Sequence, residues 1–454
     1  MFNTVLIANR GEIALRIVRT CRELGIRSVI VHSTADRDSA AVRLADQAIQ
    51  IGPSPAKLSY LNAAAIVEAA VQAEADAIHP GYGFLSEDPD FAEICASHGI
   101  TFIGPPPAVM ARLSDKAEAR EVMVAAGLPV LPGSPTALST LTEAQEVADA
   151  IGYPVMLKAA AGGGGKGMQV VRDRRDLPRA YRDCRATAQS AFGDGRVYLE
   201  RYLETARHVE IQVLCDLYGN AVHLGERDCS VQRRHQKLVE ETPAPELPPG
   251  LAARMGEAAV RAAIAVGYSG VGTFEFLVDP EGEAYFMEIN CRIQVEHPVT
   301  EMVTGIDLIR EQILVAGGRP LSLRQEDIQP RGAAIECRIN AEDPDRDFRP
   351  TPGVIEEFVP PGGAFVRVDS HCYPGWRVTP DYDSLLGKVV VWAPDREQAI
   401  ARMDRALAEC RVSGPGVATT AGFLRDILLN PLFASGKHST SLVDQMNLDA
   451  PAAG

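Results

Sequence analysis

The segment 271–295 constrains the fold more than any other part of this sequence. Its two halves alternate between apolar and polar residues, and the turn-forming residues 279–283 separate them. Because successive side chains of a strand point to opposite faces, this pattern predicts a β-hairpin with one apolar and one polar face. Folding the hairpin about its turn places Glu275 opposite Glu288.

The polar face of this hairpin carries a possible metal and anion site. Glu275, Glu288 and Asn290 converge there, and such hard oxygen ligands suit Mg²⁺ and not zinc. Arg292 offers a planar fork for an anion, and Glu296 and His297 follow as candidate acid–base groups. The alternative is the solvent face of an ordinary edge hairpin. That alternative explains the alternation but explains less well why acids and an arginine cluster there.

Composition excludes several classes of function. A length of 454 residues predicts about three domains, and a net charge of −15 argues against a general nucleic-acid binder. There is neither a secretory signal nor an apolar stretch long enough to span a membrane. The nine cysteines form no CxxC pair, which favours reduced thiols over disulfides. We expect a cytoplasmic protein that binds neither nucleic acid nor membrane.

The N-terminal part alternates strand and helix patterns. Residues 4–8 form an apolar strand, residues 11–24 have helical spacing, and residues 28–32 form the next strand. This βαβ unit predicts a parallel sheet with helices on its faces. No GxGxxG follows the first strand, so dinucleotide binding is not supported. The glycine-rich residues 79–84 lie at a strand end, where they form either a ligand loop or a structural turn.

A second glycine-rich loop, residues 162–167, lies between two predicted strands, 155–158 and 168–171. Its backbone N–H groups can cover phosphates. It is not a P-loop, because no Ser or Thr follows Lys166 and no helix follows the loop. Glycines alone would favour a flexible hairpin tip, but Lys158 and Lys166 favour phosphate binding.

Other basic and polar residues are weaker signals. Lys116 opposes the dipole of the helix that it begins, which indicates a nearby anion unless it is a solvated lysine. In the basic run 225–241, an extended chain would place Arg233, His235 and Lys237 on one side, although a solvated stripe is the default. Two further alternating runs group polar side chains: His208, Glu210 and Gln212 in one, and Glu336, Arg338 and Asn340 in the other.

Seven motifs in order resemble the biotin carboxylase component of biotin-dependent acyl-CoA carboxylases, an ATP-grasp enzyme. They are IANRGEIALR near the start, HPGYGFLSE from His79, GGGGKGM from Gly162, RHVEIQV from Arg207, GERDCSVQRRHQK from Gly225, MEINCRIQVEHPVTE from Met287 and ECRINAED from Glu336. The resemblance spans Val5 to Leu442.

This resemblance implies an α/β fold, α+β in the C-terminal part, with a three-part ATP-grasp architecture. Its parts are a Rossmann-like N-terminal domain, a small glycine-loop lid and a C-terminal mixed-sheet domain. The implied boundaries are 1–113 for the N-terminal domain, 114–204 for the first ATP-grasp part with the lid from about 130, 205–330 for the second part with the metal and bicarbonate site, 331–446 for the C-terminal domain and 447–454 for a tail.

The implied reaction is ATP-dependent carboxylation of biotin by bicarbonate, through carboxyphosphate. It is the first half-reaction of an acyl-CoA carboxylase, with acetyl-CoA as the expected acceptor in fatty-acid synthesis. A propionyl-CoA or other acyl-CoA carboxylase and a different ATP-grasp ligase are alternatives. The resemblance further implies two Mg²⁺ or Mn²⁺ ions, a separate biotin carboxyl carrier protein, separate carboxyltransferase subunits and a homodimer.

The resemblance also assigns roles to individual residues. The catalytic residues are Arg292, Glu296, Lys237 and Arg338. ATP is bound by Lys116, Lys158, Gly164, Gly165, Lys166, Gly167, Met168, Glu200, Arg201, Tyr202, Leu203, His208, Gln232, His235, Glu275 and Glu288. Bicarbonate is bound by Lys237, Arg292, Gln294 and Val295, biotin by Arg338 and Tyr82, and the metal ions by Glu275, Glu288 and Asn290.

Overall fold

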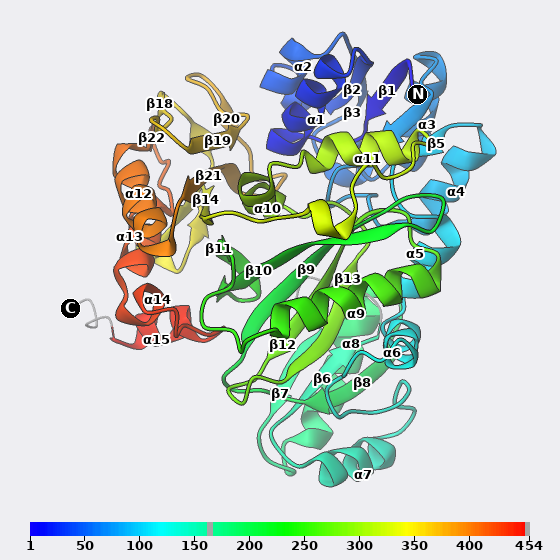
Figure 1. Cartoon of the computed structure of the whole chain (residues 1–454), viewed down its shortest axis with the longest axis vertical. Coiled ribbons are helices and arrows are strands. Elements are labelled where there is room, and N and C mark those ends of the chain that lie inside the picture. The colour runs from blue at the N-terminus through cyan, green and yellow to red at the C-terminus, as the bar shows by residue number, and fades with distance from the viewer. Residues whose placement is uncertain (161–166, 450–454) are drawn as a thin grey trace.

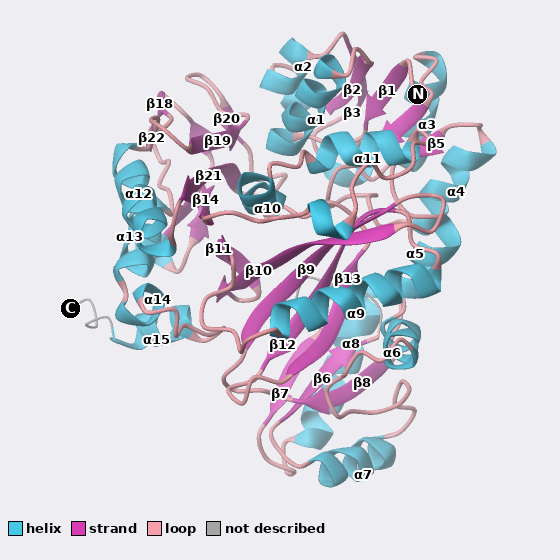
Figure 2. Cartoon of the chain, in the orientation of Figure 1, coloured by secondary structure: helices cyan, strands magenta, loops and turns pink. Residues whose placement is uncertain are grey.

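The computed structural model describes residues 1–160 and 167–449 as a mixed α/β fold. The fold is built on three main sheets: a parallel sheet near the N-terminus, a small antiparallel sheet, and a large antiparallel sheet (Figures 1 and 2). Part of the large sheet lies between the other two, and it continues into the C-terminal part of the chain. The predicted α/β class, with additional antiparallel sheets, is confirmed.

The N-terminal sheet has the strand order β3-β2-β1-β4-β5, and all its pairings are parallel. Strand β1 is buried along its whole length, as its uninterrupted apolar sequence requires in a sheet covered on both faces. The loop after β4 therefore opens at the carboxyl edge of the sheet. The elements are β1 (Thr4–Ile7), α1 (Gly11–Glu23), β2 (Arg27–Ser33), α2 (Ala40–Leu44), β3 (Gln47–Gly52), α3 (Ala63–Gln72), β4 (Ala77–His79), α4 (Pro89–Ser97) and β5 (Thr101–Phe102).

The small sheet has the order β7-β6-β8 and is antiparallel. It lies at the far end of the molecule from the N-terminal sheet, with α7 and α8 beside it (Figure 1). The elements of this region are α5 (Pro107–Ser114), α6 (Lys116–Ala125), α7 (Leu141–Ile151), β6 (Val155–Ala159), β7 (Met168–Val171), α8 (Leu177–Phe192) and β8 (Val197–Arg201).

The large sheet has eight strands in the order β13-β12-β9-β10-β11-β14-β21-β19, all antiparallel. Helix α9 packs on β9 and β10, and α12 packs on β14 and β21. The strands are β9 (Arg207–Cys215), β10 (Ala221–Arg233), β11 (Gln236–Thr242), β12 (Gly270–Val278), β13 (Ala284–Asn290), β14 (Ala333–Asn340), β19 (Val366–Ser370) and β21 (Leu385–Ala393).

The remaining elements flank this sheet. The helices are α9 (Leu251–Val266), α10 (His297–Thr304), α11 (Leu308–Ala316), α12 (Arg396–Glu409), α13 (Ala421–Leu429), α14 (Pro431–Ala434) and α15 (Leu442–Asp449). The short strands are β15 (Glu342–Asp343), β16 (Arg349–Pro350), β17 (Gly353–Val354), β18 (Glu357–Val359), β20 (Arg377–Val378) and β22 (Arg411–Ser413).

The predicted hairpin is present, with two corrections nearby. Glu275 and Glu288 are cross-strand partners in β12 and β13, as predicted. Strand β13 ends at Asn290, however, so the residues beyond it leave the sheet and bring their side chains back over it. The basic run is not one extended strand, so the condition under which Arg233, His235 and Lys237 would share one side is not met. The run folds into the hairpin β10–β11, whose tip at Arg234 and His235 has positive φ angles of 48° and 65°.

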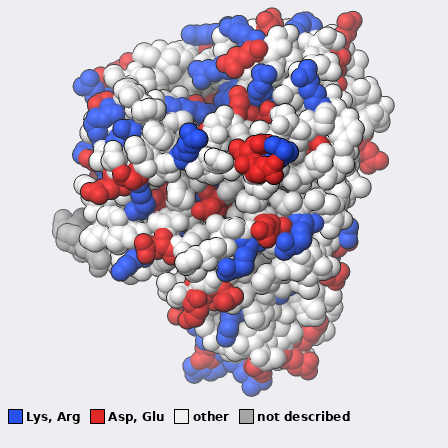
Figure 3. Space-filling model, in the orientation of Figure 1, with Lys and Arg blue, Asp and Glu red and all other residues white. Residues whose placement is uncertain are grey.

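On the face shown in Figure 3, basic and acidic side chains are interspersed and do not form a broad basic patch. Among the described residues, no helix combines the length and apolar character that crossing a membrane requires.

Candidate active site

An ammonium group surrounded by carboxylates lies at the centre of the large sheet. Lys237 Nζ is 2.6 Å from Glu210, 2.9 Å from Glu275 and 2.6 Å from Glu296. Burial alone would lower the pKa of Lys237, but the three carboxylates outweigh it and hold this pKa well above its usual value. The lysine is therefore charged, and it ties β11, β9, β12 and the segment before α10 together.

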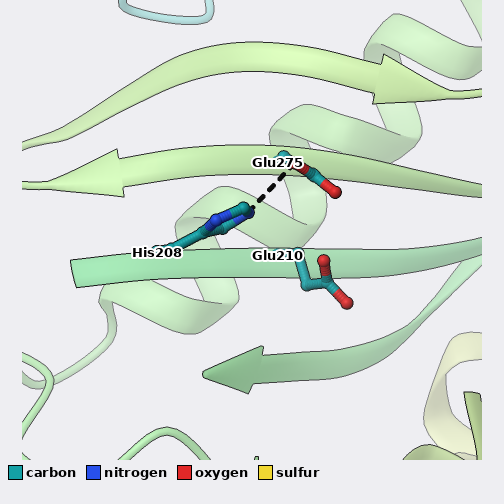
Figure 4. A group of neighbouring side chains, drawn as sticks. All are labelled: His208, Glu210 and Glu275. Carbon is teal, nitrogen blue, oxygen red and sulfur yellow. Dashed lines mark ion pairs between the residues drawn. The ribbon is translucent and has the colours of Figure 1, made fainter. Parts of the chain in front are cut away.

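The imidazole of His208, on β9, lies beside this cluster. Figure 4 shows His208 and Glu210 on β9 and Glu275 on β12, with His208 pointing toward Glu275. The His208 Nε2 atom lies 3.0 Å from Glu275 Oε2. The ligand atoms of these three residues lie within 4.8 Å of one another, but the Lys237 ammonium already contacts both carboxylates. We therefore interpret this group as an ion-pair cluster and not as a separate metal site.

Glu275 accepts hydrogen bonds from amide side chains at the end of β13 and in the segment that follows it. Its Oε1 accepts hydrogen bonds of 2.9 Å from Asn290 Nδ2 and of 2.9 Å from Gln294 Nε2, besides the contact with Lys237. Burial would raise the pKa of Glu275, but Lys237 and His208 hold it well below its usual value. An ionised carboxylate with an amide oxygen and a cross-strand carboxylate beside it is an all-oxygen donor set that fits Mg²⁺.

The guanidinium of Arg292 is held in a fixed orientation. Its Nε donates to Glu87 at 2.9 Å, Nη1 to Gln294 Oε1 at 2.9 Å, and Nη2 to Asn290 Oδ1 at 3.1 Å. Glu87 also accepts from the Cys291 backbone N–H at 2.8 Å. Sequence reasoning missed Glu87, although it ends the HPGYGFLSE motif, because nothing in the sequence brings the N-terminal sheet against the end of β13.

Glu296 lies between two cations. It accepts from Lys237 and, at 2.8 Å, from Arg338 Nη2, and it is fully buried. Burial would raise the pKa of Glu296, yet Lys237, Arg338 and Arg227 hold it well below its usual value. The structure therefore brings three predicted catalytic residues into contact and keeps the carboxylate ionised.

A chain of contacts connects the predicted biotin and bicarbonate residues. The Tyr82 hydroxyl donates to Glu12 Oε1, and the same oxygen lies 3.1 Å from Lys388 Nζ. Lys388 also donates to the Val295 carbonyl at 2.6 Å. Neither Glu12 nor Lys388 was predicted from the sequence, since each lies in a run that is otherwise an ordinary helix or strand.

The predicted nucleotide residues lie mainly around the small sheet. Lys158 on β6 forms an ion pair with Glu200 on β8, and Met168 is the cross-strand partner of Lys158. Gln232 Nε2 lies 2.7 Å from His208 Nδ1. The other described members are Gly167, whose carbonyl accepts from Ala159 N at 2.9 Å, Arg201, Tyr202 and Leu203 at the end of β8, and His235 at the exposed tip of β10–β11. Gly164, Gly165 and Lys166 lie outside the described residues, as does the side chain of Lys116.

Family models match most of the chain. The biotin carboxylase N-terminal domain matches residues 1–110, the ATP-binding domain of the carbamoyl-phosphate synthase L chain matches residues 115–324, and the biotin carboxylase C-terminal domain matches residues 336–445.

Individual relatives match nearly the whole chain. A biotin carboxylase of Nostoc sp. is 55% identical over 446 residues, which are 98% of this chain and 99% of that protein. A biotin carboxylase of Campylobacter jejuni, solved as a β,γ-ATP complex, is 51% identical with a TM-score of 0.96, covering 98% of this chain and 99% of that one. The biotin carboxylase domain of the Hydrogenobacter thermophilus 2-oxoglutarate carboxylase, solved as a dimer with MgADP, ADP and bicarbonate, is 48% identical with a TM-score of 0.96 and covers 98% of both chains. The chain belongs to the biotin carboxylase family within the ATP-grasp enzymes.

Proposed function

We propose that this chain uses ATP and bicarbonate to carboxylate biotin held on a carrier protein. The observation that carries the proposal is the line of contacts from Lys237 through Glu296 to Arg338, next to the fixed fork of Arg292. An ionised carboxylate between cations can accept a proton, and the neighbouring guanidinium can bind an anion in two-point contact. The family membership and the bound molecules named for its relatives support the same reaction.

The nucleotide would lie between the small sheet and β10–β11. We assign its phosphates to Lys116, Lys158 and the loop 162–167, and its metal ions to Glu275, Glu288 and Asn290. The base would lie by residues 200–203, and His208, Gln232 and His235 would line the nucleotide. When bound, MgATP supplies the phosphoryl group that activates bicarbonate, and the surrounding cations neutralise its charge.

Bicarbonate would lie on Arg292, Gln294, Lys237 and the Val295 backbone, with its proton toward Glu296. Lys237 and Arg338 lower the pKa of Glu296 and make it a weak base. Anionic substrates compete with Glu296 for the same cations. Substrate binding would therefore raise the pKa of Glu296 and make it a better base for the bicarbonate proton. Arg338, released from Glu296, would then stabilise the biotin enolate, with Tyr82 on the same side.

The final acceptor depends on the partner proteins. The Hydrogenobacter relative belongs to a 2-oxoglutarate carboxylase, so the family alone does not select an acyl-CoA. We keep acetyl-CoA carboxylation as the proposal, with a separate carrier protein and separate carboxyltransferase subunits. We also propose a homodimer, because that relative was solved as a dimer, and a reducing cytoplasmic compartment, because all nine cysteines are free thiols. The four-part division of the chain made from its sequence is retained as a proposal.

The test is phosphate release from MgATP by the purified chain, with and without bicarbonate and free biotin. We expect release to require bicarbonate and to rise strongly with biotin. Bicarbonate-dependent release with no response to biotin or to a biotinylated carrier would instead support a different ATP-grasp ligase. Absence of any bicarbonate-dependent release would contradict the proposal.

Glu87→Gln should weaken bicarbonate binding. The amide keeps the shape of the side chain but removes the charge that holds Arg292 Nε, so the KM for bicarbonate should rise about tenfold while the KM for ATP changes little. Initial rates at varied bicarbonate measure this effect. Glu93→Gln, an exposed site on α4, is the matched control. An unchanged bicarbonate KM in Glu87→Gln would show that Arg292 does not depend on Glu87.

A further inference from the structure

Two buried glutamates face each other behind Arg338. Glu240 on β11 and Glu336 on β14 are direct cross-strand partners, and both side chains are fully buried. Side chains opposite each other on one face of a sheet are close neighbours, and like charges at such positions repel. Neither residue was assigned a role by the sequence.

The contacts available to the pair are unequal. Glu240 Oε1 accepts from Arg338 Nε at 2.6 Å and also lies 2.5 Å from Arg338 Nη2. Glu240 Oε2 and both oxygens of Glu336 have no hydrogen-bond partner among the protein groups that the structure describes. Lys388, on the next strand, is already engaged by Glu12 and the Val295 carbonyl.

The groups around the pair supply too little positive charge for two carboxylates. Arg338 is shared with Glu296, and Lys237 is shared among three other carboxylates. The titratable and charged groups that face the pair from the packed elements are Cys229 on β10, Lys237 on β11, Glu296 and His297 at the start of α10, Arg338 on β14 and Lys388 on β21. Burial keeps the pKa of His297 well below its usual value, so this ring adds no charge.

A buried carboxylate without a cation takes up a proton instead of remaining charged. Burial raises the pKa of Glu240 to about 7, although Arg338 opposes this shift. Burial and the nearby Glu240 raise the pKa of Glu336 well above its usual value, against the opposing charge of Lys388. Geometry and electrostatics therefore agree that the two carboxyl groups are not both ionised.

We propose that Glu240 and Glu336 hold one proton between them and act as positioning residues that keep Arg338 in contact with Glu296. This inference rests on the proposed function, because it deepens the role of Arg338 in the same site. Arg338 Nη2 contacts Glu296 at 2.8 Å and Glu240 at 2.5 Å, so the guanidinium is balanced between two carboxylates. A second negative charge on Glu336 would shift that balance and draw Arg338 away from Glu296 and from the substrate side.

The first test measures the proton directly. Infrared spectra of the full chain and of Glu336→Gln should differ by the C=O stretching band of a protonated carboxylic acid. The pH dependence of stability gives the same information. In the folded chain the pKa of Glu336 lies above its usual value of 4.5, whereas in the unfolded chain Glu336 releases its proton near that usual value. The wild-type chain should therefore lose stability relative to Glu336→Gln as pH rises through this window. A missing acid band, with no such pH-dependent difference, would overturn the shared proton.

The second test separates positioning from packing by enzyme kinetics. Glu336→Gln mimics the protonated state and should keep kcat at neutral pH while retaining activity further into the alkaline range. Glu240→Gln removes the charge that holds Arg338 and should lower kcat/KM for biotin by about 10-fold or more, with an unchanged KM for ATP. Glu241→Gln is the matched control for loss of a buried carboxylate on β11, since Glu241 pairs with Arg396 away from the site.

The outcomes distinguish this inference from the proposed function. If the wild-type chain shows no biotin-dependent turnover, the proposed function fails, but the infrared and stability measurements still report the proton. If the wild type is active and Glu240→Gln matches it at every pH, the positioning role is wrong. If Glu336→Gln loses as much activity as Glu240→Gln, Glu336 acts as a charged group and the proposal is overturned.

Discussion

Glu296→Gln is expected to lower biotin-dependent ATP cleavage by about 10²- to 10⁴-fold, the range found when a general base is removed. The carboxylate lies between Lys237 and Arg338, and it is the one predicted proton acceptor that contacts both. The amide keeps nearly the same shape but cannot accept the bicarbonate proton. Steady-state phosphate release with saturating MgATP, bicarbonate and biotin measures the effect.

The control for this variant must separate chemistry from folding. Glu226→Gln changes a largely covered carboxyl group on β10 that lies outside the assigned site, and it should keep the wild-type rate. Nucleotide affinity of Glu296→Gln should stay close to that of the wild type, because the assigned phosphate residues are unchanged. A variant that binds nucleotide normally and retains more than a tenth of the wild-type rate would exclude Glu296 as the base.

Lys237→Met should produce the largest loss of stability among single substitutions in the site. It leaves Glu210, Glu275 and Glu296 buried without their common cation. Removal of one partner from a buried ion pair costs about 3–5 kcal/mol, and activity should fall to background. Urea unfolding followed by circular dichroism measures the free-energy change.

The pH dependence of this loss has a defined sign. Without the lysine, the buried carboxylates hold protons more tightly in the folded chain than in the unfolded chain, so the deficit of Lys237→Met should shrink as pH falls toward 5 and grow as pH rises. Lys437→Met, at an exposed position, should stay within about 0.5 kcal/mol of the wild type at every pH. A deficit that does not depend on pH would show that the carboxylates are neutralised in another way.

The hairpin could be predicted because its information is local. Alternation and turn residues placed Glu275 opposite Glu288 without knowledge of any other strand. The same local reasoning failed at two points. It extended β13 past Asn290, where alternation continues but the chain leaves the sheet, and it allowed an extended basic run where two residues with positive φ make a turn.

The supporting residues could not be predicted because they come from distant parts of the chain. Glu87 reaches Arg292 from the N-terminal sheet, and Glu240 reaches Arg338 only because β11 pairs with β14. Strand order in a large sheet is set by packing of the whole molecule, and no periodicity in the sequence encodes it. The resemblance supplied the residues that we propose to contact ligands, whereas the structure supplies the residues that hold those side chains in place.

The pairing of β11 with β14 limits where this polypeptide can be divided. A break in the loop between α11 and β14 would leave the backbone of β11 as an unpaired edge, with Glu240 deprived of Arg338. Neither piece alone would form a complete sheet, and each would expose a surface prone to aggregation. Expressed together, the two pieces carry matching edges, and their reassociation would restore activity in the manner of a split enzyme.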